Sequence, residues 1–409
     1  MSDEITIDLS ESKTTPHFLQ VIQKKIRSLR EMWRKLPLKQ KILISAGSAL
    51  LVLIIGFLIF WLGCPSGVFL TNVASVIQRG ENLGDIALIT PEGIRDQESP
   101  LDGVLITVQE MEQLNARRPL AVIVENHPAA RPVYGLNQAD IVYEALVEGG
   151  ITRFMPIYLR NETDKIGPIR SLRTYFLDWL AGYNEPLIMH IGYAPPAPQS
   201  DFRADVLAYM RKHGDILSLG INNGTNFWRV QDKVSPHNAF SSTARLWQKA
   251  EENGWMGLKE IDKWSYQTDI PFDERPETQE IALNWNGWGQ TSYSVKWVYN
   301  RENNYYLREC GGQKSIDSDT GEQIWAKNIV IEFSQQTLAG DSLNHILYQT
   351  TGNGDVYIFR DGQVISGSWH KNTRADRTKY YDGEGNEIKL NRGRSWIMMA
   401  PTGSEVNYE

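Results

Sequence analysis

The sequence is short of cysteine, because its 409 residues contain only Cys64 and Cys310. Two thiols so far apart offer no disulfide framework and no Cys-based zinc site, since both need several suitably spaced cysteines. No His lies near Cys310 in the sequence. We therefore expect Cys310 to be a buried small hydrophobic residue and not a nucleophile.

Signatures of several reaction classes are also absent. The sequence has no HExxH, GxSxG or P-loop pattern and no tight Asp/His spacing for a metal ion. We therefore expect no metal and no cofactor. The net charge is −7, yet residues 1–41 carry nine Lys/Arg against five Asp/Glu, which leaves −11 for the remainder. This acidic balance argues against nucleic-acid binding by the large C-terminal part.

One long hydrophobic run is present at residues 42–62, ILISAGSALLVLIIGFLIFWL, and it contains no charge. Its length predicts a membrane-spanning helix, and we place the anchor at 42–63. Residues 24–41 hold eight Lys/Arg and one Glu, so the N-terminus is expected in the cytoplasm and the rest outside. A cleaved signal peptide fits less well, since both segments are long for one. Cys64 follows a Gly as in a lipoprotein cleavage box, so its lipidation is an alternative tether.

Composition divides the chain after the anchor into three parts. Residues 64–113 have few long apolar runs and are expected to form a spacer. In residues 114–262, apolar runs at 120–124 and 186–196 predict buried strands, and helices are predicted over 169–183, 200–214 (Ser200 as cap, Gly214 as stop) and 241–254. Residues 263–409 show short alternating runs between turn signals. We predict an α+β protein, with a mixed α/β domain (114–262) followed by an all-β barrel or sandwich (263–409).

The most charged stretch is VENHPAARPVYGLNQADIVYEALVEGGITRFMPIY, residues 124–158. A helix is possible, but Gly149-Gly150 separate two β-rich runs and favour a hairpin with a two-residue turn. In that register Glu144, Glu148 and Arg153 share one face. They form either a self-compensating ion cluster or part of a cleft site.

Other polar residues follow the predicted strands and can converge. The candidate acids and bases are Glu125, Glu144, Glu148, His190 and His237. The candidate ligand-binding residues are Asn126, His127, Arg131, Arg153, Arg170, Arg173 and Asn238. Arg170 and Arg173 stand near a predicted helix start, which favours anions; alternatively they pair with Asp164 or Asp178.

The remaining candidates also have simpler structural interpretations. His190 fits a hydrogen-bonded core residue as well as a catalytic one, and His237-Asn238 fits a helix-entry turn. Trp285 and Trp288 lie among turn residues and are candidates for a sugar-stacking surface, although such Trp residues more often fill a β core.

Three long motifs resemble one known family. ENHPAARP…GLNQADIVYEALVEGGITRF, DKIGPIRSLR and SPHNAF, followed by GNGDVYIFRDGQVISGSW, are similar to the YerB-like bacterial envelope proteins, a family of unknown function with an N-terminal and a C-terminal domain. The resemblance covers roughly residues 100–409 and implies an extracytoplasmic, membrane-tethered protein with no established reaction. The positions of this sequence that match the motifs of the family are Asn126, His127, Arg131, Gly135, Asp140, Glu144, Glu148, Arg153, Gly167, Arg170, Arg173, His237 and Asn238. Glu125 and Val133-Tyr134 depart from the family pattern.

We expect a membrane-tethered extracytoplasmic protein that binds an anionic cell-wall polymer or envelope partner through Arg131, Arg153, Arg170 and Arg173. The alternative is a cell-wall hydrolase that uses paired carboxylates with a His. A third possibility is an adaptor for another envelope protein.

Overall fold

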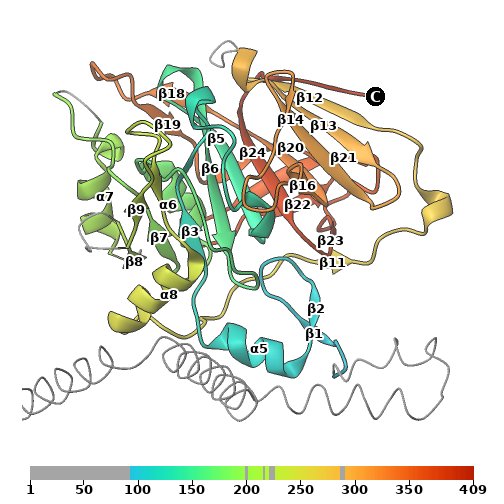
Figure 1. Cartoon of the computed structure of the whole chain (residues 1–409). Coiled ribbons are helices and arrows are strands. Elements are labelled where there is room, and N and C mark those ends of the chain that lie inside the picture. The colour runs from blue at the N-terminus through green and yellow to red at the C-terminus, as the bar shows by residue number, and fades with distance from the viewer. Residues whose placement is uncertain (1–92, 199–200, 215–216, 221–225, 286–290) are drawn as a thin grey trace, which may run out of the picture. The chain divides into compact units, whose positions relative to one another are not determined.

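The structure is a computed structural model that describes residues 93–409, except 199–200, 215–216, 221–225 and 286–290 (Figure 1). The described residues belong to one compact unit. The predicted anchor at 42–63 and Cys64 lie outside the described residues. Among the helices that are described, none is long and apolar enough to cross a membrane.

The described residues contain four α-helices: α5 (Val108–Asn115), α6 (Thr174–Ala181), α7 (Val206–His213) and α8 (Thr243–Glu252). The three predicted helices are present, but α6 and α7 begin later than expected. Residues before α6 are extended, with Leu172 bridged to Tyr193. Asp205 caps α7 by accepting a hydrogen bond from the Ala208 amide at 3.0 Å. Gly214 ends α7 in the left-handed conformation, as predicted.

Strands make up most of the rest. Those before residue 263 are β1 (Gln97–Glu98), β2 (Leu105–Ile106), β3 (Leu120–Val122), β4 (Val124–Glu125), β5 (Ile141–Val147), β6 (Ile151–Tyr158), β7 (Leu187–Met189), β8 (Leu217–Ser218), β9 (Trp228–Arg229) and β10 (Ala239–Phe240). Those after it are β11 (Tyr266–Gln267), β12 (Glu280–Asn284), β13 (Val295–Asn300), β14 (Tyr305–Cys310), β15 (Gln313–Lys314), β16 (Trp325–Ala326), β17 (Asn328–Ser334), β18 (Gln336–Leu338), β19 (Ile346–Tyr348), β20 (Gly352–Arg360), β21 (Gln363–Lys371), β22 (Lys379–Asp382), β23 (Leu390–Asn391), β24 (Ser395–Pro401) and β25 (Glu405–Tyr408).

The two halves of the sequence share one large sheet. It has the order β22-β21-β20-β17-β24-β5-β6-β3-β7-β8, and β4 also pairs with β6. The junction is parallel, with Trp396 of β24 opposite Val142 of β5. Within the described residues after 263 there are only strands and short 3-10 turns, which confirms the all-β prediction. Five of these strands, however, join the mixed sheet, so the second half builds one antiparallel sheet of its own and shares the larger sheet with the first half.

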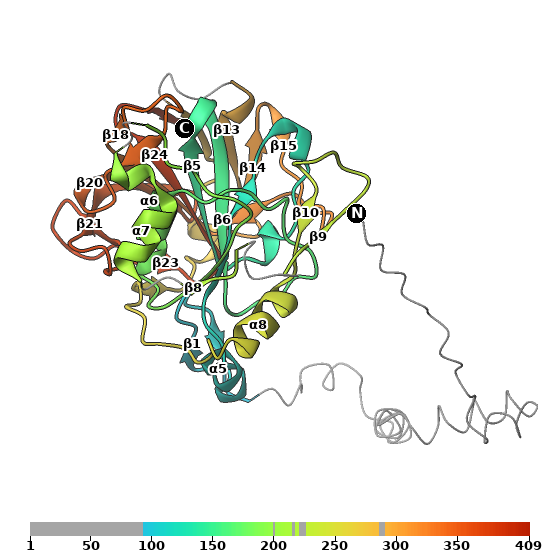
Figure 2. The same cartoon turned by 90° about the vertical axis from the view of Figure 1, so that its left-hand side faces the viewer.

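The mixed sheet lies between a helical layer and an antiparallel sheet. Figures 1 and 2 show α6 and α7 on one side of it and β12–β14 on the other. The antiparallel sheet has the order β15-β14-β13-β12-β25, with β16 also on β14. Because both faces of β5 are covered, all seven of its residues are buried.

The predicted hairpin of β5 and β6 is confirmed, but its predicted register was wrong by one residue. Glu144 faces Phe154 and Ala145 faces Arg153, because Glu148–Gly150 form a three-residue 3-10 turn with both glycines at positive φ. Side chains of a strand alternate between faces. Glu144 and Arg153 therefore lie on opposite faces of the sheet, and not on one face as expected.

The described end of the segment expected to be a spacer is folded. β1 and β2 pair, and Thr107 caps α5 in a reciprocal capping box with Glu110. Leu101, Ile106 and Leu114 are buried in the main core. This differs from the extended segment that composition indicated, because alternating polar residues concealed a short amphipathic helix.

The buried carboxyl of Glu332 in β17 should make the free energy of unfolding depend on pH. Burial raises the pKa of Glu332 from an ordinary 4.5 to about 7, and its carboxyl accepts a 2.7 Å hydrogen bond from Tyr380. The folded state thus binds the proton more tightly than the unfolded state. Glu332 therefore contributes to the free energy of unfolding at acidic pH, and this contribution is lost as pH rises from about 5 to 8. The loss amounts to about 3 kcal/mol at most, at 1.36 kcal/mol per pKa unit.

The Glu332→Gln variant isolates this effect from other titrating groups. Gln stays neutral and can still accept from Tyr380. Urea unfolding at pH 5, 6.5 and 8 should show the variant gaining stability relative to the native protein as pH rises. Parallel pH profiles of the two proteins would contradict the prediction.

Candidate functional site

Three segments meet around the carboxylate of Glu125, which is 4% exposed at the end of β4. The Glu125 amide donates to Pro168 O at 2.9 Å, and the Ile169 amide donates to Ala239 O at 2.7 Å. These backbone bonds bring the loop before α6 and the loop before α8 against β4. Arg170 and His237 consequently reach the same carboxylate.

Both oxygens of Glu125 are engaged. His237 Nδ1 lies 2.8 Å from Oε2, and Arg170 Nε lies 3.2 Å from Oε1. The His127 ring stacks on the His237 ring, with centroids 5.0 Å apart. The sequence predicted that these loops converge, and the structure places the four residues together. The expected partners of Arg170, Asp164 or Asp178, are replaced by Glu125.

Asn126 and Arg131 extend this group. Arg131 Nε donates to both the backbone O (3.1 Å) and Oδ1 (3.0 Å) of Asn126, and its Nη2 donates to Ser292 O at 3.0 Å. Among the described residues, Arg131 has no carboxylate within 4.0 Å and its Nη1 has no hydrogen-bond partner. We name Glu125, Asn126, His127, Arg131, Arg170 and His237 the Glu125 cluster.

A pocket of about 420 Å³ opens beside Asn126 and Arg131. Its walls come from both halves of the sequence. The apolar lining includes Val133 and Phe154, and the second half adds Arg308 and the exposed Lys314. The pocket therefore offers an apolar surface with cations on its wall, a typical composition for a small-molecule site.

A second ion pair lies next to the cluster. Arg173 Nε donates to both Glu148 oxygens at 2.9 and 3.0 Å, and its Nη2 donates at 2.6 Å. Burial alone would raise the pKa of Glu148, but the hydrogen bonds and charge of Arg173 outweigh it and lower the pKa. Arg173 is thus committed to Glu148.

Arg153 lies between these two groups without an ion pair. It is 9% exposed, and its Nη1 donates to Ser171 O at 2.7 Å. Burial, together with the neighbouring charge of Arg173, lowers its pKa to about 10. Within the described residues no carboxylate lies within 4.0 Å of Arg153. The arginines around Glu125 and Glu148 therefore outnumber the carboxylates, and this region retains an excess of positive charge.

Glu144 lies on the face of the mixed sheet opposite to Arg153. It is 0% exposed and accepts bonds from Arg308 Nη2 at 2.8 and 3.0 Å, from Thr152 Oγ1 at 3.0 Å and from Trp396 Nε1 at 3.0 Å. The proposed Glu144–Arg153–Glu148 cluster does not exist. Sequence reasoning missed Arg308, although β14 signals it: Arg308 is an inward position between the buried Tyr306 and Cys310.

Three other candidates are structural. His190 is 4% exposed, burial lowers its pKa, and its nitrogens lie 2.8 Å from Gly192 O and 3.0 Å from Ser218 Oγ. Asn238 closes its own loop with Arg229 and Val230. Trp285 is 3% exposed and donates to Tyr293 O, so it does not form a sugar-stacking surface; Trp288 lies outside the described residues. Cys310 is buried, as predicted.

No group of three or more His, Cys, Asp or Glu that could hold a metal ion occurs in the part of the chain that the structure describes.

The fold and the site define a two-part protein, in which an α/β half and a β half share a sheet and a pocket. Two family models match it: the N-terminal domain of "Protein of unknown function (DUF3048)" at residues 106–256 and the C-terminal domain of the same family at 283–397. The chain belongs to this family.

Two comparisons place it within the family. The chain is 30% identical over 316 residues to the "Putative lipoprotein YerB" of Bacillus subtilis (strain 168), covering 76% of this chain and 88% of the relative. The crystal structure of YerB from Bacillus subtilis matches with a TM-score of 0.65 at 26% identity, covering 76% of this chain and all of that one. The resemblance inferred from the motifs is confirmed.

Proposed function

We propose that the protein is a membrane-associated envelope protein in which the Glu125 cluster, together with the neighbouring Arg153 and Arg173, binds an anionic envelope component. The uncharged run at 42–62 supports membrane attachment, as does the lipoprotein name of the relative. The binding proposal rests on one observation. Four guanidinium groups, those of Arg131, Arg153, Arg170 and Arg173, lie with only two carboxylates, those of Glu125 and Glu148.

The unpaired charge indicates where the anion binds. Arg131 has donor groups fixed in place by Asn126 and Ser292, and it stands on the wall of the 420 Å³ pocket. A guanidinium held in this way recognises carboxylate or phosphate with little loss of side-chain freedom. The apolar lining of the pocket favours an anion that carries an apolar part.

The proposal predicts that Arg131→Gln/Arg170→Gln lowers retention on anionic wall polymer by roughly tenfold or more. Each charge-assisted hydrogen bond contributes about 1.5–3 kcal/mol. Purified full chain in detergent is sedimented with wall material that keeps or lacks its anionic polymer. Retention should need the anionic polymer and fall with added salt. Equal retention of the native and double-variant proteins would remove the proposal.

Arg301→Gln is the matched control. Arg301 has the same exposed fraction as Arg170, 26%, and also pairs with one acid, Glu277, but it is not part of the cluster. Its retention should equal that of the native protein. A loss in all variants would show only that net charge drives non-specific adsorption.

One observation favours the enzyme alternative. His237 Nδ1 is held by Glu125 at 2.8 Å, an arrangement in which a carboxylate orients a general base. Glu144 does not support a paired-carboxylate mechanism, because it is fully buried in an ion pair. Release of soluble fragments from the same wall material, lost in His237→Asn, would favour the hydrolase; retention without release favours the binder.

A further inference from the structure

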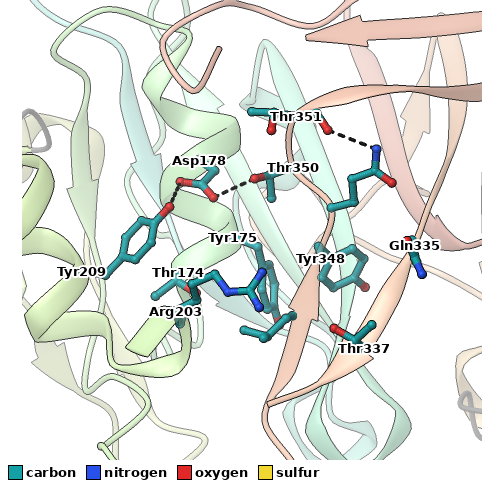
Figure 3. A pocket seen from close by; sticks show the side chains of 12 residues that line it. Thr174, Tyr175, Asp178, Arg203, Tyr209, Gln335, Thr337, Tyr348, Thr350 and Thr351 are labelled. Carbon is teal, nitrogen blue, oxygen red and sulfur yellow. Dashed lines mark hydrogen bonds between the residues drawn. The ribbon is translucent and has the colours of Figure 1, made fainter. Parts of the chain in front are cut away.

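A second pocket, of about 470 Å³, lies where α6, α7 and the β18–β19 hairpin meet. Figure 3 shows α6 with Asp178 on one side and, on the other, β18 with Thr337, β19 with Tyr348, and Gln335 just before β18. It shares no residue with the Glu125 cluster. Its volume is within the range of about 300–1,000 Å³ that small-ligand sites occupy.

The charged groups of this pocket are compensated. Asp178 accepts hydrogen bonds from Tyr209 Oη at 2.7 Å, from Thr350 Oγ1 at 2.8 Å and from Arg374 Nε at 2.8 Å. Arg203 pairs with Asp201 at 2.7 Å. An ionic ligand would therefore compete with existing pairs, and the pocket favours a neutral one.

Aromatic rings form the inner end of the pocket. The Tyr175 and Tyr348 rings lie 4.7 Å apart between centroids. Their hydroxyls are engaged by the backbone of Leu146, at 3.0 Å for Tyr175 and 3.0 and 3.3 Å for Tyr348. The tyrosines are thus held in place, and because Tyr175 is 2% and Tyr348 7% exposed, they form a rigid wall that offers the cavity no free hydroxyl and little ring surface.

Three neutral polar side chains around the cavity remain unengaged. Gln335 and Thr337 are exposed and Thr351 is half-buried, and all three line the pocket. Among the described residues, the Gln335 amide and the Thr337 and Thr351 hydroxyls have no hydrogen-bond partner. Amides and hydroxyls both donate and accept, as sugar hydroxyls do.

From these features we infer that the pocket binds a neutral saccharide. Hydroxyl-rich rings match the neutral donors and acceptors of Gln335, Thr337 and Thr351. The site is independent of the anion site, so either assignment can fail without the other.

The test is calorimetric titration of the full chain, in a detergent without a sugar headgroup, with two neutral probes: an N-acetylglucosamine tetrasaccharide and a glucose tetrasaccharide. Binding of at least one is expected. Thr337→Trp should abolish it by filling the cavity, and Gln335→Met/Thr337→Val, which keeps side-chain size, should weaken it about tenfold or more. Absence of heat from both probes at millimolar concentration overturns the inference.

Two controls test whether the binding is specific to this pocket and to a neutral sugar. Gln363→Met replaces an exposed glutamine at the start of β21, outside the pocket, and should leave the affinity unchanged. Inorganic phosphate in excess should not compete with the sugar. If phosphate displaces it, or if Gln335→Met/Thr337→Val binds as tightly as the native protein, the saccharide assignment is wrong.

Discussion

Replacing Arg308 with Met should lower the free energy of unfolding by about 3–5 kcal/mol, the cost of removing one partner from a buried ion pair. Arg308 and Glu144 have side chains 1% and 0% exposed, with Nη2 and Oε1 2.8 Å apart. Without Arg308, Glu144 is left as an uncompensated charge between the mixed sheet and the antiparallel sheet. Urea unfolding followed by tryptophan fluorescence measures the change.

The size of the loss should depend on pH. A protonated carboxyl is much cheaper to bury than a carboxylate. The Arg308→Met protein should therefore lose more stability at pH 8 than at pH 5. An equal loss at both values would mean that lost packing, and not unpaired charge, causes the effect.

A double variant and a surface variant serve as controls. Glu144→Gln/Arg308→Met removes both charges but keeps an acceptor for Thr152 and Trp396, so it should regain most of the stability. Arg301→Met breaks the more exposed pair with Glu277 and should cost at most about 1 kcal/mol. If Arg308→Met costs no more than Arg301→Met, burial adds nothing to the Glu144–Arg308 pair.

The same pair shows how far the sequence could predict the site. Apolar residues occur on both faces of 141–147, which indicates at least partial burial of Glu144, and the structure buries it completely. Its partner lies 164 residues away, and no local pattern pairs two such positions. The loops ending at Glu125, Arg170 and His237 were easier to relate, because each follows or precedes a recognisable strand or helix.

Local sequence patterns could not predict the register of the β5–β6 hairpin or the sheet that the two halves share. Gly149-Gly150 correctly marked the hairpin, but both two- and three-residue loops use such glycines. One additional loop residue moved Arg153 to the opposite face from Glu144. The parallel pairing of β24 with β5 joins segments about 250 residues apart, and its register depends on burial of both strands and not on any turn.

Arg377 fixes the start of the described chain to the second half, and Arg377→Met should lower the free energy of unfolding by about 2–4 kcal/mol. Arg377 is 2% exposed. Its Nη1 donates to Pro100 O and its Nη2 to Leu101 O, both at 3.1 Å, and its guanidinium lies 3.6 Å from the Trp264 ring centroid. Its loss leaves the buried Pro100 O unsatisfied, at a cost of about 1–3 kcal/mol. Leu101 O loses one hydrogen bond but still accepts from Tyr266 Oη, and the cation–π contact is removed.

The effect should also be local, which distinguishes it from general destabilisation. The amides of Ser99 and Gly103 donate to Val104 O and Ser99 O in the turn that Arg377 holds. Their hydrogen exchange should accelerate in Arg377→Met more than that of amides in β5, since a turn that loses its anchor opens without global unfolding. Arg377→Lys, which keeps the charge but not the forked donors, should show the same acceleration. If Lys restores native exchange at these amides, charge alone holds the turn and the forked geometry is not needed.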